Sequence, residues 1–212
     1  MEVGFSDLDA DAIAEVLESG EIDLLVSSWF PRDEKFMGPG LRIIGDLYQP
    51  VTSFAAFEPL GPIETLLASD FDRVIVADDS REAFDSASAR LPALSELPVE
   101  TVGEGALVEQ LEKAQAMGSR PLVVATQPHA IFHLPLLHVI EDSASLLGKE
   151  MSARMIIRDD AARNADQDLL DELSEMMLGN KVMSALDYAI GVEGQDPDDA
   201  AEAWQRGRLL PR

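Results

Sequence analysis

The chain has 212 residues, no cysteine and a formal net charge of −24, from 40 acidic and 16 basic residues. The absence of cysteine excludes disulfides, thiolate catalysis and cysteine-ligated metals. A surface this negative repels phosphate backbones and anionic lipids, so we expect no nucleic-acid partner and no peripheral membrane role. Mean hydropathy is near zero and no apolar run is long enough to span a membrane, which predicts a globular protein.

The first part of the chain predicts a β-α-β unit. We expect a short strand at residues 2–5, an acidic helix at about 9–19, and then a buried strand of a parallel sheet that begins at Ile22. Proline cannot donate to a strand ladder, so this strand must end near Pro31. Trp29 then lies at the carboxyl end of a strand, where open α/β sheets carry ligands. An aromatic ring there is a candidate surface for stacking or for a cation, and the alternative is that Trp29 packs under a loop.

A similar arrangement follows in the second half of the chain. The apolar strand expected at 121–125 also ends in polar residues before a proline, Thr126-Gln127-Pro128. Two such strands, one in each half, predict two lobes that face each other across a cleft, with Trp29 opposite Thr126. The other expected strands are 41–47, 51–57, 72–77, 99–102, 136–141 and 153–158, and the other expected helices are 81–91, 106–117, 167–177, 181–190 and 198–206.

These elements predict an α/β protein with two lobes and mixed, mainly parallel sheets. Pro59, Gly61 and Pro62 punctuate the chain strongly enough to mark a hinge. We therefore expect a partial first lobe at 1–58, a hinge at 59–62, a second α/β lobe at 63–160 and C-terminal helices at 161–212.

Catalytic and metal motifs are weak in this sequence. His129 and His133 have the i, i+4 spacing of a metal pair, but no third ligand lies at a recognisable spacing, which favours packing and capping roles. No nucleophile elbow and no phosphate-binding glycine loop is present. We therefore expect no enzyme activity and no cofactor, which leaves binding as the function.

Several segments, in order, resemble the glycine betaine and proline betaine substrate-binding proteins of ABC transporters. The run Ser27-Ser-Trp-Phe-Pro31 is similar to the Ser-Ala-Trp-Leu-Pro of that family, and 120–129 is similar to its Pro-Ile-Val-Val-Thr-Gly-Trp-Thr-Pro-His. Further similarity lies at 137–142, 154–158 and 194–204.

The resemblance implies a fold like that of periplasmic binding proteins, which closes on a quaternary-ammonium solute. In the family, tryptophans surround the cation, and backbone amides with a histidine hold the carboxylate. This sequence departs from that pattern: Thr126 replaces a cage tryptophan, Glu34 falls where the family has a histidine, and 78–82 replaces a glycine-rich loop. In the usual order of the family a further β-α unit precedes the position of Met1, so the resemblance leads us to expect an incomplete first lobe here.

Two interpretations follow from the resemblance. In the first, the chain binds a small zwitterionic or quaternary-ammonium solute and works with an ABC transporter membrane subunit. The ligand-binding residues are then Trp29, Glu34, Ser80, Arg81, Thr126 and Gln127.

Within this interpretation Arg81 takes a carboxylate and Glu34 meets a cationic amine. The alternative for Arg81 is a surface pair with Glu82 or Asp85. The location is extracytoplasmic if the chain is processed or trimmed, and cytoplasmic if Met1 is the native start.

In the second interpretation the fold is a degenerate regulatory or interaction module without a betaine ligand. An incomplete first lobe leaves a sheet edge open, which favours a homodimer.

The charge imbalance generates a first prediction. Acidic surfaces poor in lysine recur in proteins that work at high salt, because ions screen the repulsion between like charges. We expect the thermal unfolding midpoint to rise as sodium chloride is raised to molar concentration, measured by circular dichroism. A midpoint that does not respond to salt would remove the high-salt hypothesis.

Overall fold

The computed structural model describes residues 4, 6 and 12–211. The chain divides into two compact units, and each unit is built from two separate stretches of chain. Unit 1 contains residues 1–49 and 151–178, and unit 2 contains residues 50–150 and 179–212. The strand expected at 2–5 lies, apart from Gly4, outside the described residues, as does the beginning of the helix expected at 9–19. Among the residues that are described, no helix could cross a membrane.

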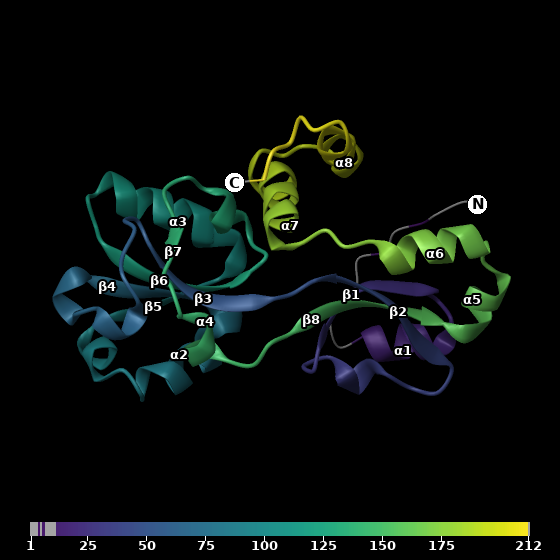
Figure 1. The fold of residues 1–212 in the computed structure, drawn as a ribbon, viewed down its shortest axis with the longest axis horizontal. Helices are drawn as coiled ribbons and strands as arrows, with labels where there is room; N and C mark the ends of the chain where they lie inside the picture. Colours follow the sequence, from purple (N-terminus) through teal and green to yellow (C-terminus); the bar gives the residue numbers. More distant parts are fainter. Residues whose placement is uncertain (1–3, 5, 7–11, 212) are drawn as a thin grey trace. The chain divides into compact units, whose positions relative to one another are not determined.

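Unit 1 is a small antiparallel sheet with helices packed on it (Figure 1). The strand order is β1-β8-β2, and both outer strands pair antiparallel with β8. The central strand is apolar: Met155, Ile156 and Ile157 are all buried. The elements are α1 (Ile13–Ser19), β1 (Leu24–Phe30), η1 (Glu34–Phe36), β2 (Leu41–Tyr48), β8 (Ser152–Arg158), α5 (Asp159–Asn164) and α6 (Gln167–Glu175).

The strand that carries Trp29 was expected inside a parallel sheet, and this expectation is wrong. Among the described residues β1 pairs only with β8, and the pairing is antiparallel. A register shift between Leu25 and Ser28 interrupts the ladder, and Val26 is 49% exposed. The apolar run of this strand is therefore only partly buried. The predicted end of the strand is confirmed, because β1 stops at Phe30 and Pro31 follows.

Close packing between α6 and β2 depends on a glycine. A Cβ atom built on Gly45 of β2 would lie 3.1 Å from the Leu173 carbonyl oxygen and 3.1 Å from the Ser174 Cα, both on α6. The helix backbone therefore sits directly against this strand position. Asp166 caps the same helix by accepting a hydrogen bond from the Asp168 backbone N–H, 2.9 Å away.

Unit 2 is a five-stranded mixed sheet with strand order β5-β4-β6-β3-β7. Among the described strands, β4 pairs in parallel with β5 and β6, whereas β3 pairs antiparallel with β6 and β7. The expected α/β class with mixed sheets is confirmed, although antiparallel pairing is more frequent than expected. The strands are β3 (Val51–Ala56), β4 (Arg73–Ala77), β5 (Val99–Val102), β6 (Pro121–Gln127) and β7 (His138–Val139).

The sheet of unit 2 is buried on both faces. Alternate residues of each strand point to opposite faces. On one face Val74 and Val124 form an apolar cluster with Phe84 of α2. On the other face Ile75 forms a second cluster with residues of α3. The helices are η2 (Ile63–Thr65), η3 (Ala68–Asp70), η4 (Asp78–Ser80), α2 (Arg81–Ser88), η5 (Pro92–Glu96), α3 (Glu104–Ala116), η6 (Ala130–His133), α4 (Ala144–Leu147), α7 (Asn180–Asp187), η7 (Tyr188–Val192) and α8 (Pro197–Gln205).

The division of the chain differs from the expected boundaries at 58, 62 and 160. β3 was expected in the first lobe, but it lies between β6 and β7 in the sheet of unit 2. In the other direction, β8, α5 and α6 belong to unit 1 although they follow most of unit 2 in the sequence. Strand pairing between distant parts of the chain produces this exchange, and local punctuation by proline and glycine does not reveal it.

The packing at Gly45 generates a second prediction. We expect Gly45→Val to lower the free energy of unfolding by about 1–3 kcal/mol, because its side chain overlaps the backbone of α6. Denaturant unfolding measures the change. Gly105→Ala is the matched control, because nothing lies within 4 Å of a Cβ at Gly105. If both variants unfold at the same denaturant concentration, α6 does not pack on this strand as described.

Candidate functional site

Trp29 lies at the end of β1, where its indole is held by Tyr48. The Trp29 Nε1–H donates to the Tyr48 hydroxyl at 3.1 Å, and the Ser27 and Tyr48 hydroxyls lie 2.6 Å apart. The two rings meet edge to face, with centroids 6.5 Å apart and planes at 89°. Trp29 is partly exposed whereas Tyr48 is buried. Tyr48 therefore fixes the orientation of an indole that solvent can still reach.

The contact between these rings depends on a small residue between them. Trp29 on β1 and Tyr48 on β2 both pair with Ala153 on the central strand. Paired residues point to the same face of a sheet, so both rings stand beside the single methyl group of Ala153. A larger side chain at this position would hold the rings apart.

The turn after β1 places a charged pair against the indole. The Trp29 backbone N–H donates to Asp33 Oδ2 at 2.6 Å, and the Asp33 N–H donates to the Trp29 carbonyl at 2.8 Å. The buried Asp33 carboxylate also accepts from Arg32 Nε and Nη2, at 2.9 and 3.1 Å. The Arg32 guanidinium lies over the Trp29 ring, with its Cζ 4.6 Å from the ring centroid. A cation of this protein thus already stands on the predicted binding surface.

Glu34 follows this turn, in the short helix η1. Its backbone N–H donates to the Pro31 carbonyl at 3.2 Å, and the residue is exposed. Trp29 and Glu34 both belong to unit 1, whereas Ser80, Arg81, Thr126 and Gln127 belong to unit 2. The predicted opposition of Trp29 and Thr126 therefore joins two units and stays a prediction.

In unit 2, a chain of hydroxyl groups runs across the ends of three strands. Thr52 pairs with Thr126 across the sheet, and their hydroxyl oxygens lie 2.8 Å apart. The Thr126 oxygen lies 3.0 Å from the Ser80 hydroxyl, which donates its proton to Asp79 Oδ1 at 2.8 Å. Since each hydroxyl has one proton, Thr126 donates to Ser80 and Thr52 donates to Thr126. All three protons are thus directed along the chain toward the Asp79 carboxylate, and both Ser80 and Thr126 are buried.

The end of β6 is anchored by backbone bonds to α7. β6 ends at Gln127, which is partly exposed, and Pro128 follows as predicted. The His129 N–H donates to the Ser184 hydroxyl at 3.2 Å, and the Ala130 N–H donates to Asp187 at 2.6 Å. These bonds fix the direction in which the chain leaves the strand.

The histidines take the packing and capping roles favoured over a metal pair. His129 Nδ1 accepts a hydrogen bond from the Ile131 N–H at 3.2 Å and so caps η6. The buried His133 ring packs against Tyr188, with centroids 5.2 Å apart. The spacing of these histidines is therefore explained by a short 3₁₀ turn.

Arg81 forms the surface pair that was the alternative to a carboxylate-binding role. Its Nε donates to both oxygens of Asp85, at 2.9 and 3.0 Å, and its Nη1 donates to the Thr101 hydroxyl at 3.0 Å. The Arg81 side chain is 44% exposed, so this pair is solvated and easily exchanged. A role for Arg81 toward a ligand would require it to leave Asp85.

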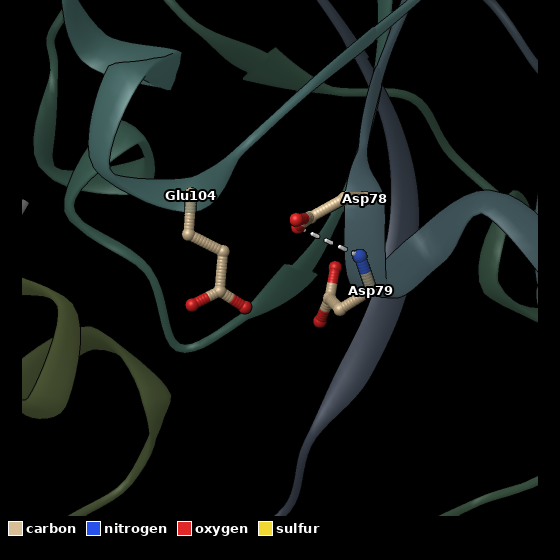
Figure 2. A group of neighbouring side chains, drawn as sticks. All are labelled: Asp78, Asp79 and Glu104. Atoms are coloured by element: carbon tan, nitrogen blue, oxygen red, sulfur yellow. Dashed lines mark hydrogen bonds between the residues drawn. The ribbon is translucent and has the colours of Figure 1, made fainter.

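Three carboxylates gather beside the hydroxyl chain, where β4 ends and α3 begins. Asp78, Asp79 and Glu104 have oxygens within 4.8 Å of one another, and all three residues are exposed (Figure 2). The Glu104 pKa is raised above its ordinary value of 4.5, first because protein atoms displace part of its water and then because Asp79 and Asp78 are negative. His129 opposes this shift and Asp187 adds to it. Their spacing would suit a divalent cation, but exposed acidic groups commonly gather without one.

Sequence reasoning missed the residues that hold the predicted ones in place. In unit 1 these are Arg32, Asp33, Tyr48 and Ala153, and in unit 2 they include Thr52. The period-2 alternation along β1 could have placed Ser27 and Trp29 on one face. Tyr48 and Thr52 become neighbours of the predicted residues only once the strand order is known. Two hollows elsewhere in unit 2 are lined by other residues, Ala203 in one and Pro98 in the other.

Glu104 generates a third prediction, with a sign that can be checked. A raised pKa in the folded state means that ionising Glu104 costs stability, and this cost grows as the pH rises above 4.5. We expect Glu104→Gln to unfold at a higher temperature than the unmodified protein at pH 7, with the difference shrinking toward pH 4.

Glu109 is the matched control on the same helix, because Lys113 lowers its pKa through a hydrogen bond and its positive charge. Its ionised form is therefore stabilising, and Glu109→Gln should lower the unfolding temperature at pH 7 and lose this effect toward pH 4. Shifts of the same sign in both variants would contradict the described surroundings of Glu104.

Comparison with known proteins places this geometry in a family. Residues 90–206, more than half of the chain, match the family model described as the substrate binding domain of ABC-type glycine betaine transport system. Among curated proteins, none matches this sequence.

Solved structures with this fold include lactococcal OpuAC in its closed-liganded conformation with glycine betaine. It is 18% identical, with a TM-score of 0.68, and the match covers 94% of this chain and 82% of that one. ProX from Borrelia burgdorferi, a glycine betaine and L-proline binding protein, is 18% identical, with a TM-score of 0.65. The match covers 97% of this chain and 84% of that one. An ABC-transporter choline binding protein in complex with choline is 16% identical, with a TM-score of 0.60. The match covers 92% of this chain and 74% of that one.

The fold expected from the resemblance is thereby confirmed. The matched family consists of substrate-binding proteins and not of enzymes. Its model covers β6, the polar residues that follow this strand, and the helices α3 and α7. This chain belongs to the family of substrate-binding domains of ABC-type glycine betaine transport systems.

Proposed function

We propose that this protein binds a small zwitterionic or quaternary-ammonium solute for an ABC-type uptake system of compatible solutes. The observation that carries the proposal is the family match over residues 90–206. The matched solved structures have the same fold, and their names include binding proteins for glycine betaine and for choline. A membrane subunit of an ABC transporter is the partner that this function requires.

Trp29 is the proposed contact for the cationic end of the solute. A quaternary ammonium group has no N–H to donate, so an aromatic face is the surface that recognises it. The indole of Trp29 is partly exposed and is oriented by Tyr48 through its Nε1–H. A pre-oriented ring loses little entropy on binding, which supports this role. Glu34, exposed on η1, is the proposed counter-charge in the same unit.

The proposed contacts for the other end of the solute lie in unit 2. The protons of Ser80 and Thr126 are used within the hydroxyl chain, so either hydroxyl must turn its proton toward the solute before it can donate to a carboxylate. Gln127 carries an amide that can both donate and accept, at the partly exposed end of β6. We propose that Arg81 exchanges Asp85 for the carboxylate of a zwitterion.

One observation favours a second candidate, a module of the same fold without a solute ligand. The Trp29 face is covered by Arg32, and the hydroxyls of Ser80 and Thr126 are satisfied within the protein. Groups that already have partners give up those contacts when a ligand binds. Self-association would then be the property to measure, by the mass of the particle in solution.

The proposed function generates a fourth prediction. We expect isothermal titration calorimetry against glycine betaine, proline betaine, choline and proline to detect saturable binding of at least one solute. Trp29→Ala should weaken that binding by about 2- to 30-fold, the range that one cation–π contact supplies.

Trp204→Phe is the matched control, since it changes the other tryptophan of the chain, on α8. This control should leave the affinity unchanged and should make Trp29 the sole fluorescent reporter. Absence of binding across the whole panel, with a defined dimer in solution, would favour the second candidate.

A further inference from the structure

The contact between Arg32 and Trp29 has a geometry that bears on solute choice. The guanidinium lies over the indole face, with Cζ 4.6 Å from the ring centroid. This is the position that a ligand cation takes over an aromatic ring, within about 6 Å of its centroid. The protein thus contributes a positive charge of its own to the surface that the proposed function assigns to the cation of the solute.

The guanidinium is held in place by the turn that follows β1. Asp33 accepts two hydrogen bonds from Arg32, from Nε and Nη2, and the same carboxylate accepts from the Trp29 backbone. The Asp33 side chain is 10% exposed, whereas that of Arg32 is 56% exposed. The carboxylate that anchors the arginine is therefore buried, while more than half of the Arg32 side chain is in contact with solvent.

We infer that Arg32 is a specificity-determining residue that acts as a tethered cation on the face of Trp29. This inference rests on the proposed function, because it takes Trp29 as the surface for the solute cation. A ligand cation that approaches this face must displace the guanidinium and is repelled by its charge. Arg32 therefore lowers the affinity for quaternary ammonium ions that carry no negative group.

A zwitterion is affected less by the same arginine. When the ammonium group of a betaine displaces the guanidinium, the carboxylate of that solute attracts the displaced positive charge. Choline and tetramethylammonium have no carboxylate, so nothing compensates for the affinity that they lose to repulsion by the guanidinium. Arg32 thus biases the surface toward zwitterions and against simple cations, although the aromatic contact is the same for both.

The test compares Arg32→Gln with the unmodified protein. Tetramethylammonium chloride and glycine betaine are titrated at constant chloride, and binding is followed by the NMR shift of the Trp29 indole N–H and by calorimetry. We expect the Kd for tetramethylammonium to fall by about 2- to 5-fold in the variant, since an exposed cation–π contact has about this strength. The Kd for betaine should change less, so that the ratio of the two constants shifts.

Arg154→Gln is the matched control in the same unit. The Arg154 guanidinium lies 5.0 Å from the ring centroid of Phe30, which is buried, so this arginine also has a ring contact but covers no binding surface. We expect its removal to leave both dissociation constants unchanged. Equal tightening of tetramethylammonium in the two variants would show an effect of net charge alone and would overturn the inference.

The remaining outcomes separate this inference from the proposed function. If the unmodified protein binds betaine but Arg32→Gln binds tetramethylammonium no more tightly, the tethered-cation role is overturned and the function stands. If neither solute binds to any variant, the inference about Arg32 is overturned, while the proposed function is decided separately by the full panel of solutes. A second readout needs no variant: the Arg32 δ-methylene protons must show an upfield ring-current shift in the free protein, and their normal position would also overturn the inference.

Discussion

The indole of Trp29 is fixed from three directions, and the account of this protein depends on that constraint. Tyr48 accepts its Nε1–H, Asp33 accepts its backbone N–H, and Arg32 covers its face. The contact with Tyr48 requires the order of the unit 1 sheet, in which both residues pair with Ala153, whereas the other two contacts lie within the turn that follows β1. A partly exposed tryptophan held this firmly has a defined orientation, so a ligand that contacted it would lose little entropy in ordering the ring.

Unit 2 contributes a different kind of surface. The hydroxyls of Thr126 and Ser80 direct their protons inward to Asp79, and the carboxylates of Asp78 and Glu104 stand beside them. The Glu104 pKa is raised first by partial loss of water around its carboxyl group and then by the negative charges of Asp79 and Asp78. Oxygen lone pairs and carboxylates attract positive charge, so an anionic group of a solute needs a compensating cation such as Arg81.

Local signals in the sequence predicted much of the fold. The apolar run of β6 and the proline after it identified the strand and its polar end. The direction and burial of β1 could not be predicted in this way, because they depend on pairing with β8 far along the chain. The position of β3 could not be predicted for the same reason. Its place in the sequence predicts the first lobe, but it pairs with strands of unit 2.

The sequence could predict the site residues that lie at the end of a strand. It could not predict the residues that contact them and fix their orientation. Trp29 and Thr126 are recognisable from their positions before a proline, whereas Tyr48, Ala153 and Thr52 require the strand order. Arg32 stands three residues after Trp29 in the sequence, but its place over the ring depends on the turn that Asp33 closes.

The central claim is that the face of Trp29 contacts the cation of a bound solute. Its most direct test is the nuclear Overhauser effect between the N-methyl protons of isotope-labelled glycine betaine and the ring protons of Trp29, at solute concentrations that saturate the protein by calorimetry. The account predicts cross-peaks to the Trp29 ring and none to Trp204. Saturated binding without any cross-peak to Trp29 would contradict it.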